Sequence, residues 1–167
     1  MEEKTCAQCG QAACMSTFSG TALCEGHFRE HFDRRVFATV REFSMIGPRE
    51  HVGVAVSGGK DSMVMLRLLA SLREHLPMRL TAILVDEGIA GYRNQTIPTA
   101  QKECRKLKVP LRITSFKKEF GKSLDQILGK RNKDAKKSSR SFGACSYCGV
   151  FRRTLLNRAA RRLKVDK

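Results

Sequence analysis

Short blocks of apolar residues alternate along the chain with longer segments in which apolar residues recur every three or four positions. Three blocks have the length of buried strands: 51–56, 80–85 and 111–115. Four segments have helical periodicity: 28–44, 63–72, 93–108 and 150–163. This alternation predicts an α/β fold, in which a parallel sheet carries flanking helices and right-handed crossovers join the strands.

A glycine turn joins the first predicted strand to the helix that follows it. The string Ser57–Ser62 reads SGGKDS and lies directly between these two elements. Glycine lets a backbone approach a ligand closely, and a helix start offers unpaired N–H groups and a positive dipole end to an anion. Lys60 adds a mobile positive charge. The turn therefore predicts a phosphate-binding site, although its spacing is not that of a Walker loop.

The net charge of +16 lies entirely in the last part of the chain. Residues 102–167 contain 21 basic and 5 acidic side chains, whereas residues 1–101 contain 11 of each. A one-sided basic surface is typical of nucleic-acid-binding proteins, and a well-solvated surface is the alternative. No apolar run reaches about 18 residues and no signal pattern opens the chain, so we expect a cytoplasmic protein without a membrane partner.

Cysteines and a histidine at the N-terminus have the spacing of a metal site. Two ligand pairs, Cys6 with Cys9 and Cys24 with His27, can close a tetrahedral structural zinc site. In a reducing cytosol such thiols bind metal more often than they form disulfides. We expect a zinc knuckle over residues 1–30, a linking helix over 31–48 and a nucleotide-binding domain over 49–167.

A second cysteine pair, Cys145 and Cys148, opens the last predicted helix beside Arg152 and Arg153. Thiols at a helix start near arginines have lowered pKa values. They can act as nucleophiles or as cluster ligands, and half of a zinc site is a third interpretation. The preceding segment 117–140 is strongly basic, and we expect residues 132–141 to form a mobile loop that could order on a polyanion.

The SGGKDS string resembles the PP-loop of ATP pyrophosphatases. Together with Val85–Tyr92 (VDEGIAGY), the segment 145–153 (CSYCGVFRR) and the N-terminal ligand pairs, it makes nearly the whole chain similar to the tRNA 2-thiolation enzymes, the group that contains TtcA and TtuA. Within that group the chain most resembles the branch of cytoplasmic tRNA 2-thiolation protein 1.

The resemblance implies an adenine nucleotide alpha hydrolase-like, Rossmann-like fold. It implies that the protein binds ATP with Mg²⁺, adenylates the C2 oxygen of a uridine in tRNA (the wobble uridine in this branch) and then replaces that oxygen with sulfur. It further implies a ubiquitin-like sulfur carrier as donor, and a second copy or a second thiolation subunit as partner.

The resemblance also assigns roles to individual residues. The implied ATP-binding residues are Ala55, Ser57, Gly58, Gly59, Lys60, Asp61, Ser62, Val85 and Arg152. The implied catalytic residues are Lys60, Asp61, Cys145 and Cys148. The last two would hold an iron–sulfur cluster or carry persulfide sulfur, and Cys6, Cys9, Cys24 and His27 would hold zinc.

The chain departs from this family at one point. The family's third cluster cysteine lies downstream, and no cysteine follows Cys148. We therefore expect a fragment, or one piece of a split protein, with a sheet that is incomplete at the C-terminus and has an exposed edge.

Two other functions are compatible with the motifs. One is a different PP-loop ATP user, such as a tRNA lysidine synthetase-like or amidotransferase-type ligase, which leaves the second cysteine pair unexplained. The other is a non-catalytic tRNA-binding or scaffold subunit.

Overall fold

The computed structural model describes residues 4–89, 91, 93–127 and 144–167, and for residues 144–147 it describes the backbone alone. The chain divides into two compact units, Met1–Ile46 and Gly47–Lys167. Each unit is described by itself. Among the described residues, no helix combines the length and the apolar character that a bilayer crossing requires. The predicted loop 132–141 lies outside the described residues.

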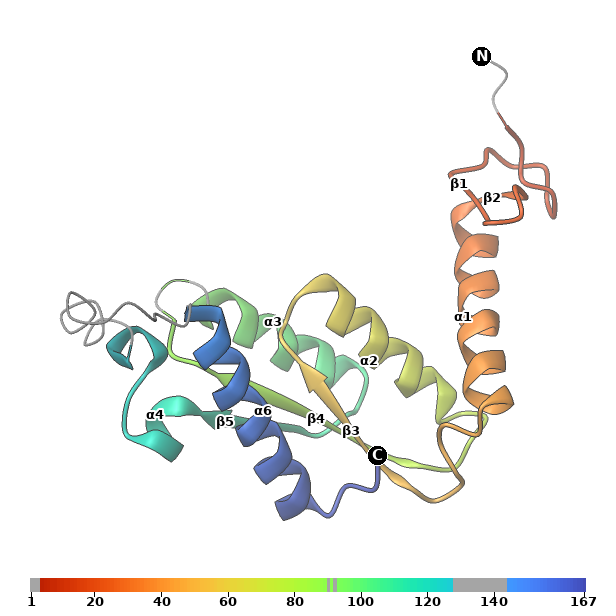
Figure 1. Ribbon diagram of the computed structural model, residues 1–167. Coiled ribbons are helices and arrows are strands. Elements are labelled where there is room, and N and C mark those ends of the chain that lie inside the picture. The colour runs from red at the N-terminus through yellow and green to blue at the C-terminus, as the bar shows by residue number, and fades with distance from the viewer. Residues whose placement is uncertain (1–3, 90, 92, 128–143) are drawn as a thin grey trace. The chain divides into compact units, whose positions relative to one another are not determined.

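The first unit is a small hairpin followed by one long helix (Figure 1). Strands β1 (Met15–Ser16) and β2 (Ala22–Leu23) pair antiparallel, and helix α1 (Glu25–Glu42) follows at once. Cys6, Leu23 and Cys24 are buried together, with Phe28 packed against them. The helix begins a few residues before the predicted start at residue 28, so its first turn belongs to this cluster.

The second unit contains a three-stranded parallel sheet (Figure 1). Its strands are β3 (His51–Val56), β4 (Arg79–Asp86) and β5 (Leu111–Ser115), in the order β3-β4-β5. The predicted strands and their parallel pairing are confirmed. β4 lies in the centre and is almost fully buried, as its continuous apolar run requires.

Helices cover both faces of this sheet (Figure 1). Helices α2 (Lys60–Leu72) and α3 (Arg93–Lys106) follow β3 and β4 and lie along one face. The short helix α4 (Phe116–Phe120) follows β5, and the long helix α6 (Ala144–Leu163) crosses the other face. Two successive right-handed crossovers in the same direction place α2 and α3 on the same side.

The core under α6 joins this helix to the sheet and to α4. Its buried members are Val85, Phe116, Leu124, Cys148 and Leu155. Val150, the first residue of the predicted segment 150–163, lies outside this core and is 55% exposed. The line Cys148–Arg152–Leu155 faces the sheet instead, so Arg152 contacts a buried carboxylate.

The chain's last described residues lie along the outer edge of β3. The Lys167 amide donates to the His51 carbonyl (3.3 Å), and the Gly53 amide donates to the Lys167 carbonyl (2.8 Å). This alternation is the pattern of a parallel ladder. The outer edge of β3 is therefore partly paired, and α6 returns the chain across the sheet to that edge.

Replacing a core residue of α6 should cost far more stability than replacing an exposed one. Leu155 is 1% exposed, so Leu155→Ala should lower the free energy of unfolding by about 2–5 kcal/mol through lost burial and a residual cavity. Val150→Ala on the same helix is the matched control and should stay within about 0.5 kcal/mol. Urea unfolding checks both values, and equal losses would contradict the packing of α6 described above.

Candidate nucleotide and sulfur site

The turn Ser57–Gly59 has a shape that only glycine allows at its centre. Gly58 has a φ of +84°, and a Cβ atom built there would lie 2.3 Å from the carbonyl oxygen of Thr96 in α3. Gly59 then caps α2, with φ −81° and ψ 159°. The turn therefore packs closely against the first turn of α3. The backbone amides of the turn and of the start of α2 both lie at the carboxyl end of β3.

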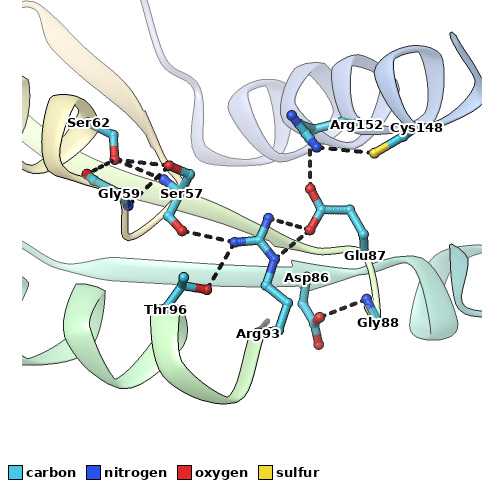
Figure 2. A network of polar contacts seen from close by, with 10 residues as sticks. All are labelled: Ser57, Gly59, Ser62, Asp86, Glu87, Gly88, Arg93, Thr96, Cys148 and Arg152. Carbon is cyan, nitrogen blue, oxygen red and sulfur yellow. Dashed lines mark hydrogen bonds and ion pairs between the residues drawn. The ribbon is translucent and has the colours of Figure 1, made fainter. Parts of the chain in front are cut away.

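Two serine hydroxyls hold the turn in place (Figure 2). Ser62 Oγ donates to the Gly59 carbonyl (2.9 Å) and accepts from the Ser57 amide (3.2 Å). Ser57 Oγ accepts from the Gly59 amide (3.3 Å) and lies 3.2 Å from Ser62 Oγ. These two hydroxyls belong to predicted ATP-binding residues. They therefore also hold the loop in its conformation without a bound ligand.

A pocket of about 190 Å³ opens beside this turn, at the carboxyl ends of β3 and β4. Such crevices are where open α/β sheets bind their ligands. The lining residues are Ala55, Val56, Ser57, Ser62, Val85, Arg93, Arg152 and Leu156. The structure thus brings five of the predicted ATP-binding residues to one cavity, and it adds Arg93, which the sequence reasoning did not single out.

Lys60 and Asp61 do not line this pocket. Their side chains are each 89% exposed and form an ion pair, with Nζ 2.8 Å from Oδ1. The hydrogen bond and the charge of Asp61 raise the pKa of the Lys60 ammonium. Both residues stand at the first turn of α2, where a flexible lysine can reach an anion bound at the helix start.

A fully buried carboxylate organises the floor of the site (Figure 2). Glu87 is 0% exposed and forms ion pairs with two guanidinium groups, those of Arg93 and Arg152. Arg93 Nη1 donates onward to the Ser57 carbonyl (2.9 Å). Arg152 Nη2 donates to Cys148 Sγ (3.1 Å). One carboxylate is therefore linked to both the glycine turn and a predicted sulfur residue.

Glu87 belongs to the string Val85–Tyr92, which carries part of the family resemblance, but the sequence predicts no role for this residue. The available signal was a carboxylate directly after a buried strand, at the edge where ligands bind. The neighbouring Asp86 instead shapes the loop, since its Oδ1 accepts from the Gly88 amide at 2.9 Å.

The positive charge of Arg152 is held firmly at this place. Burial lowers the pKa of its guanidinium, but the ion pair with Glu87 and the contact with Cys148 Sγ outweigh burial and raise that pKa. Arg152 is still 48% exposed. Its exposed side can therefore bind a phosphate while its buried side remains paired with Glu87.

The second cysteine pair is only partly described. Cys148 is 8% exposed and lies in the α6 core, whereas the side chain of Cys145 lies outside the described residues. A [4Fe–4S] cluster takes three or four protein ligands, and the sequence offers two thiols at this helix start with no cysteine after them.

The first unit brings together the four predicted zinc ligands. The ligand atoms of Cys6, Cys9, Cys24 and His27 all lie within 4.8 Å of one another. Cys9 Sγ is 3.8 Å from Cys24 Sγ, and His27 Nδ1 is 3.3 Å from Cys24 Sγ. Tetrahedral zinc, with bonds of about 2.3 Å to sulfur and 2.0 Å to nitrogen, separates its ligand atoms by about 3.5–3.8 Å. The donor set fits that ion.

One thiol of this set is already acidic. Burial raises the pKa of Cys6, but hydrogen bonds from the backbone at Cys24, Gln8 and Cys9, with one from His27, outweigh it and lower the pKa to about 6. Thiolates are the form that binds metal. Cys14 is not part of the set, since its Sγ donates to the Leu23 carbonyl at 3.7 Å.

Comparison with known proteins identifies the family. Residues 29–140, more than half of the chain, match the model of the PP-loop domain. The chain belongs to the PP-loop domain family. The turn Ser57–Ser62, which resembles the PP-loop in sequence, lies within the matched residues and is called the PP-loop below.

Relatives with this PP-loop domain are named for tRNA thiolation. The chain is 34% identical over 163 residues to cytoplasmic tRNA 2-thiolation protein 1 of Drosophila pseudoobscura pseudoobscura, covering 96% of this chain and 45% of that protein. It is 33% identical over 171 residues to the tRNA 2-thiolation protein NcsA of Haloferax volcanii, covering 97% and 51%. The chain thus spans about half the length of these relatives.

Solved structures agree with this PP-loop fold. The U34-tRNA thiolase NcsA of Methanococcus maripaludis, described with its [4Fe-4S] cluster, matches with a TM-score of 0.80 and 34% identity, over 97% of this chain and 51% of that one. An NH3-dependent NAD synthetase of Campylobacter jejuni matches with a TM-score of 0.53 and 18% identity, over 79% and 52%. The second likeness concerns the fold alone.

A methyl group at the centre of the PP-loop should not be tolerated. Gly58→Ala puts an alanine at positive φ, which costs about 1–3 kcal/mol, and drives its Cβ into the Thr96 carbonyl. Gly59→Ala is the matched control, because its Cβ would meet Ser57 Oγ at an ordinary 3.4 Å. Thermal unfolding should show a clear loss for Gly58→Ala and a smaller one for Gly59→Ala. The reverse order would refute the tight approach of the turn to α3.

Proposed function

We propose that this chain is the nucleotide-binding part of an ATP-dependent, cytoplasmic tRNA 2-thiolation enzyme. The observation that carries the proposal is the pocket at the carboxyl ends of β3 and β4. The PP-loop forms one wall of it, and Arg152 lines it while donating to Cys148 at 3.1 Å. The proposed adenylation site therefore lies next to the proposed sulfur site. The names of the relatives support the same activity.

The residues around the pocket suit ATP accompanied by Mg²⁺. Ala55 and Val85 offer apolar contacts at two strand ends, where an adenosine can pack. Ser57, Gly58, Gly59 and Ser62 present amides and hydroxyls to the phosphates. Lys60, Asp61 and Arg152 are the charged groups within reach. Preorganised donors and cations of this kind favour the charge that develops as pyrophosphate leaves.

The reaction divides into two displacements. The C2 oxygen of a uridine attacks the α-phosphorus of ATP, the bond to the β-phosphate breaks, and pyrophosphate departs. A sulfur nucleophile then attacks C2, the C–O bond breaks, and AMP departs with the oxygen, leaving 2-thiouridine. Lys60 and the start of α2 offset charge in the first step, and Cys145 and Cys148 supply or hold the sulfur in the second.

One face of α6 suits the phosphates of tRNA. This helix contains five arginines and no acidic residue. Arg153 and Arg161 are exposed and lie eight residues apart on one line of the helix, with exposed Asn157 between them. Since this line starts one turn after the sulfur site, RNA bound along it would lie beside that site.

The remaining partners follow from the relatives and the donor sets. We propose zinc at Cys6, Cys9, Cys24 and His27 as a closed structural site. An iron–sulfur cluster would need ligands beyond Cys145 and Cys148. The sulfur donor would be a ubiquitin-like carrier, and the protein partner would be a second copy or a second thiolation subunit.

Adenylation should depend on the PP-loop lysine. The purified chain, given ATP, Mg²⁺, tRNA and sulfide, should release AMP and pyrophosphate and form 2-thiouridine, measured by nucleoside mass spectrometry. Lys60→Ala should lower AMP release by about a hundredfold, in line with losing one charge-stabilising group. Lys102→Ala on exposed α3 is the charge-matched control and should match the wild type.

The cysteine pair separates the two half-reactions. Cys145→Ser should retain ATP binding and AMP release but form no 2-thiouridine. If the wild-type chain releases no AMP, the proposed function is wrong. Thiolation by Cys145→Ser at the wild-type rate would remove this residue from sulfur transfer.

Zinc should bind the N-terminal ligand set with one equivalent per chain. Cys24→Ser removes a buried ligand and should abolish stoichiometric zinc in elemental analysis, because three donors do not close the tetrahedron. Cys14→Ser is the matched control: it removes a nearby thiol outside the set and should keep the metal. Zinc retained by Cys24→Ser would assign the metal elsewhere.

A further inference from the structure

The carboxylate of Glu87 is more deeply buried than any other charged group with a described ion pair. Its side chain is 0% exposed, beside 7% for Arg93 and 48% for Arg152. Removing a carboxylate from water is costly unless its partners have good geometry. Here Arg93 binds Oε2 and Arg152 Nε donates to Oε1 at 2.7 Å, so both oxygens are used.

The two arginines reach in different directions from this carboxylate (Figure 2). Arg93 extends to the backbone of the PP-loop, and Arg152 extends to Cys148. Both also line the pocket. The three charged groups leave one net positive charge there, which complements a polyphosphate. Glu87 is the one acceptor that both guanidiniums share, so it links their positions to each other.

We infer that Glu87 is a positioning residue for the nucleotide. Through Arg93 it fixes the PP-loop carbonyl of Ser57, and through Arg152 it fixes the cation that lies between the bound phosphates and Cys148. This inference rests on the proposed use of ATP. It adds a residue that acts through others and does not itself touch the substrate.

A double-mutant cycle on ATP affinity tests this role. Glu87→Gln keeps the side chain's shape but removes its charge, and Arg152→Met keeps much of the arginine stem. Each should weaken ATP binding, measured by calorimetry with Mg²⁺, by about tenfold or more. Because Glu87 acts partly through Arg152, the double variant should lose clearly less than the product of the two single losses. In AMP release, the KM for ATP should rise more than kcat falls.

Glu119→Gln is the matched control for this cycle. Glu119 also forms ion pairs with two arginines, Arg158 and Arg162, but it lies by a separate pocket lined by β5, α4 and α6. Its loss removes the same charge from an equivalent ion-pair triad. ATP affinity should stay within about twofold of the wild type, which separates a positioning role from a general effect of net charge.

Glu87→Asp, a shorter acidic side chain, is the second variant to test if Glu87→Gln does not fold. Glu87→Asp keeps the charge but lacks one methylene, so it cannot span both guanidiniums, and ATP affinity should fall by about tenfold. Wild-type affinity in Glu87→Asp, or multiplicative losses in the cycle, would overturn the inference. ATP binding without 2-thiouridine would overturn the thiolation proposal alone, and no ATP binding by the wild type would overturn both.

Discussion

The ion pairs of Glu87 hold together the end of β4, the start of α3 and helix α6, whose Arg152 lies 65 residues after Glu87. The carboxylate follows β4, Arg93 begins α3, and Arg152 comes from α6 on the opposite face of the sheet. Breaking one of these ion pairs in the low-dielectric interior would leave a charge without a partner, which is costly. The pairs therefore hold the segments at fixed positions relative to one another. Because Arg93 also binds the Ser57 carbonyl, the PP-loop is tied to the same point.

The parallel sheet makes this convergence possible. β3 and β4 run in the same direction, so the glycine turn after β3 and the Glu87 loop after β4 open at one edge. α6 then crosses the other face and brings Cys148 and Arg152 to that edge. The glycine turn after β3 thus meets a cation and a thiol that both come from α6, and the geometry of one sheet sets the spacing among them.

The two cysteine sites differ in the number of donors that the chain supplies. Four donors surround one point in the first unit, which suits a closed metal site that stabilises a small hairpin with little core of its own. Near the start of α6, the described thiol of Cys148 is buried and contacts the Arg152 guanidinium beside the pocket. The first arrangement leaves no open coordination position, whereas the second pairs one thiol with a cation.

The sequence by itself determined the elements and the motif. Strands 51–56 and 111–115 appear with the predicted bounds, because apolar blocks and their glycine or proline borders are local signals, and SGGKDS located the phosphate turn for the same reason. The tertiary structure alone decided which charged residues are buried. Glu87 and Arg93 look like surface residues in the sequence, but they are buried as an ion pair, and Glu87 also pairs with Arg152, 65 residues further along the chain. The rotation of α6, which exposes Val150 and turns Arg152 inward, was likewise set by packing against Val85 and Phe116, which helical periodicity cannot specify.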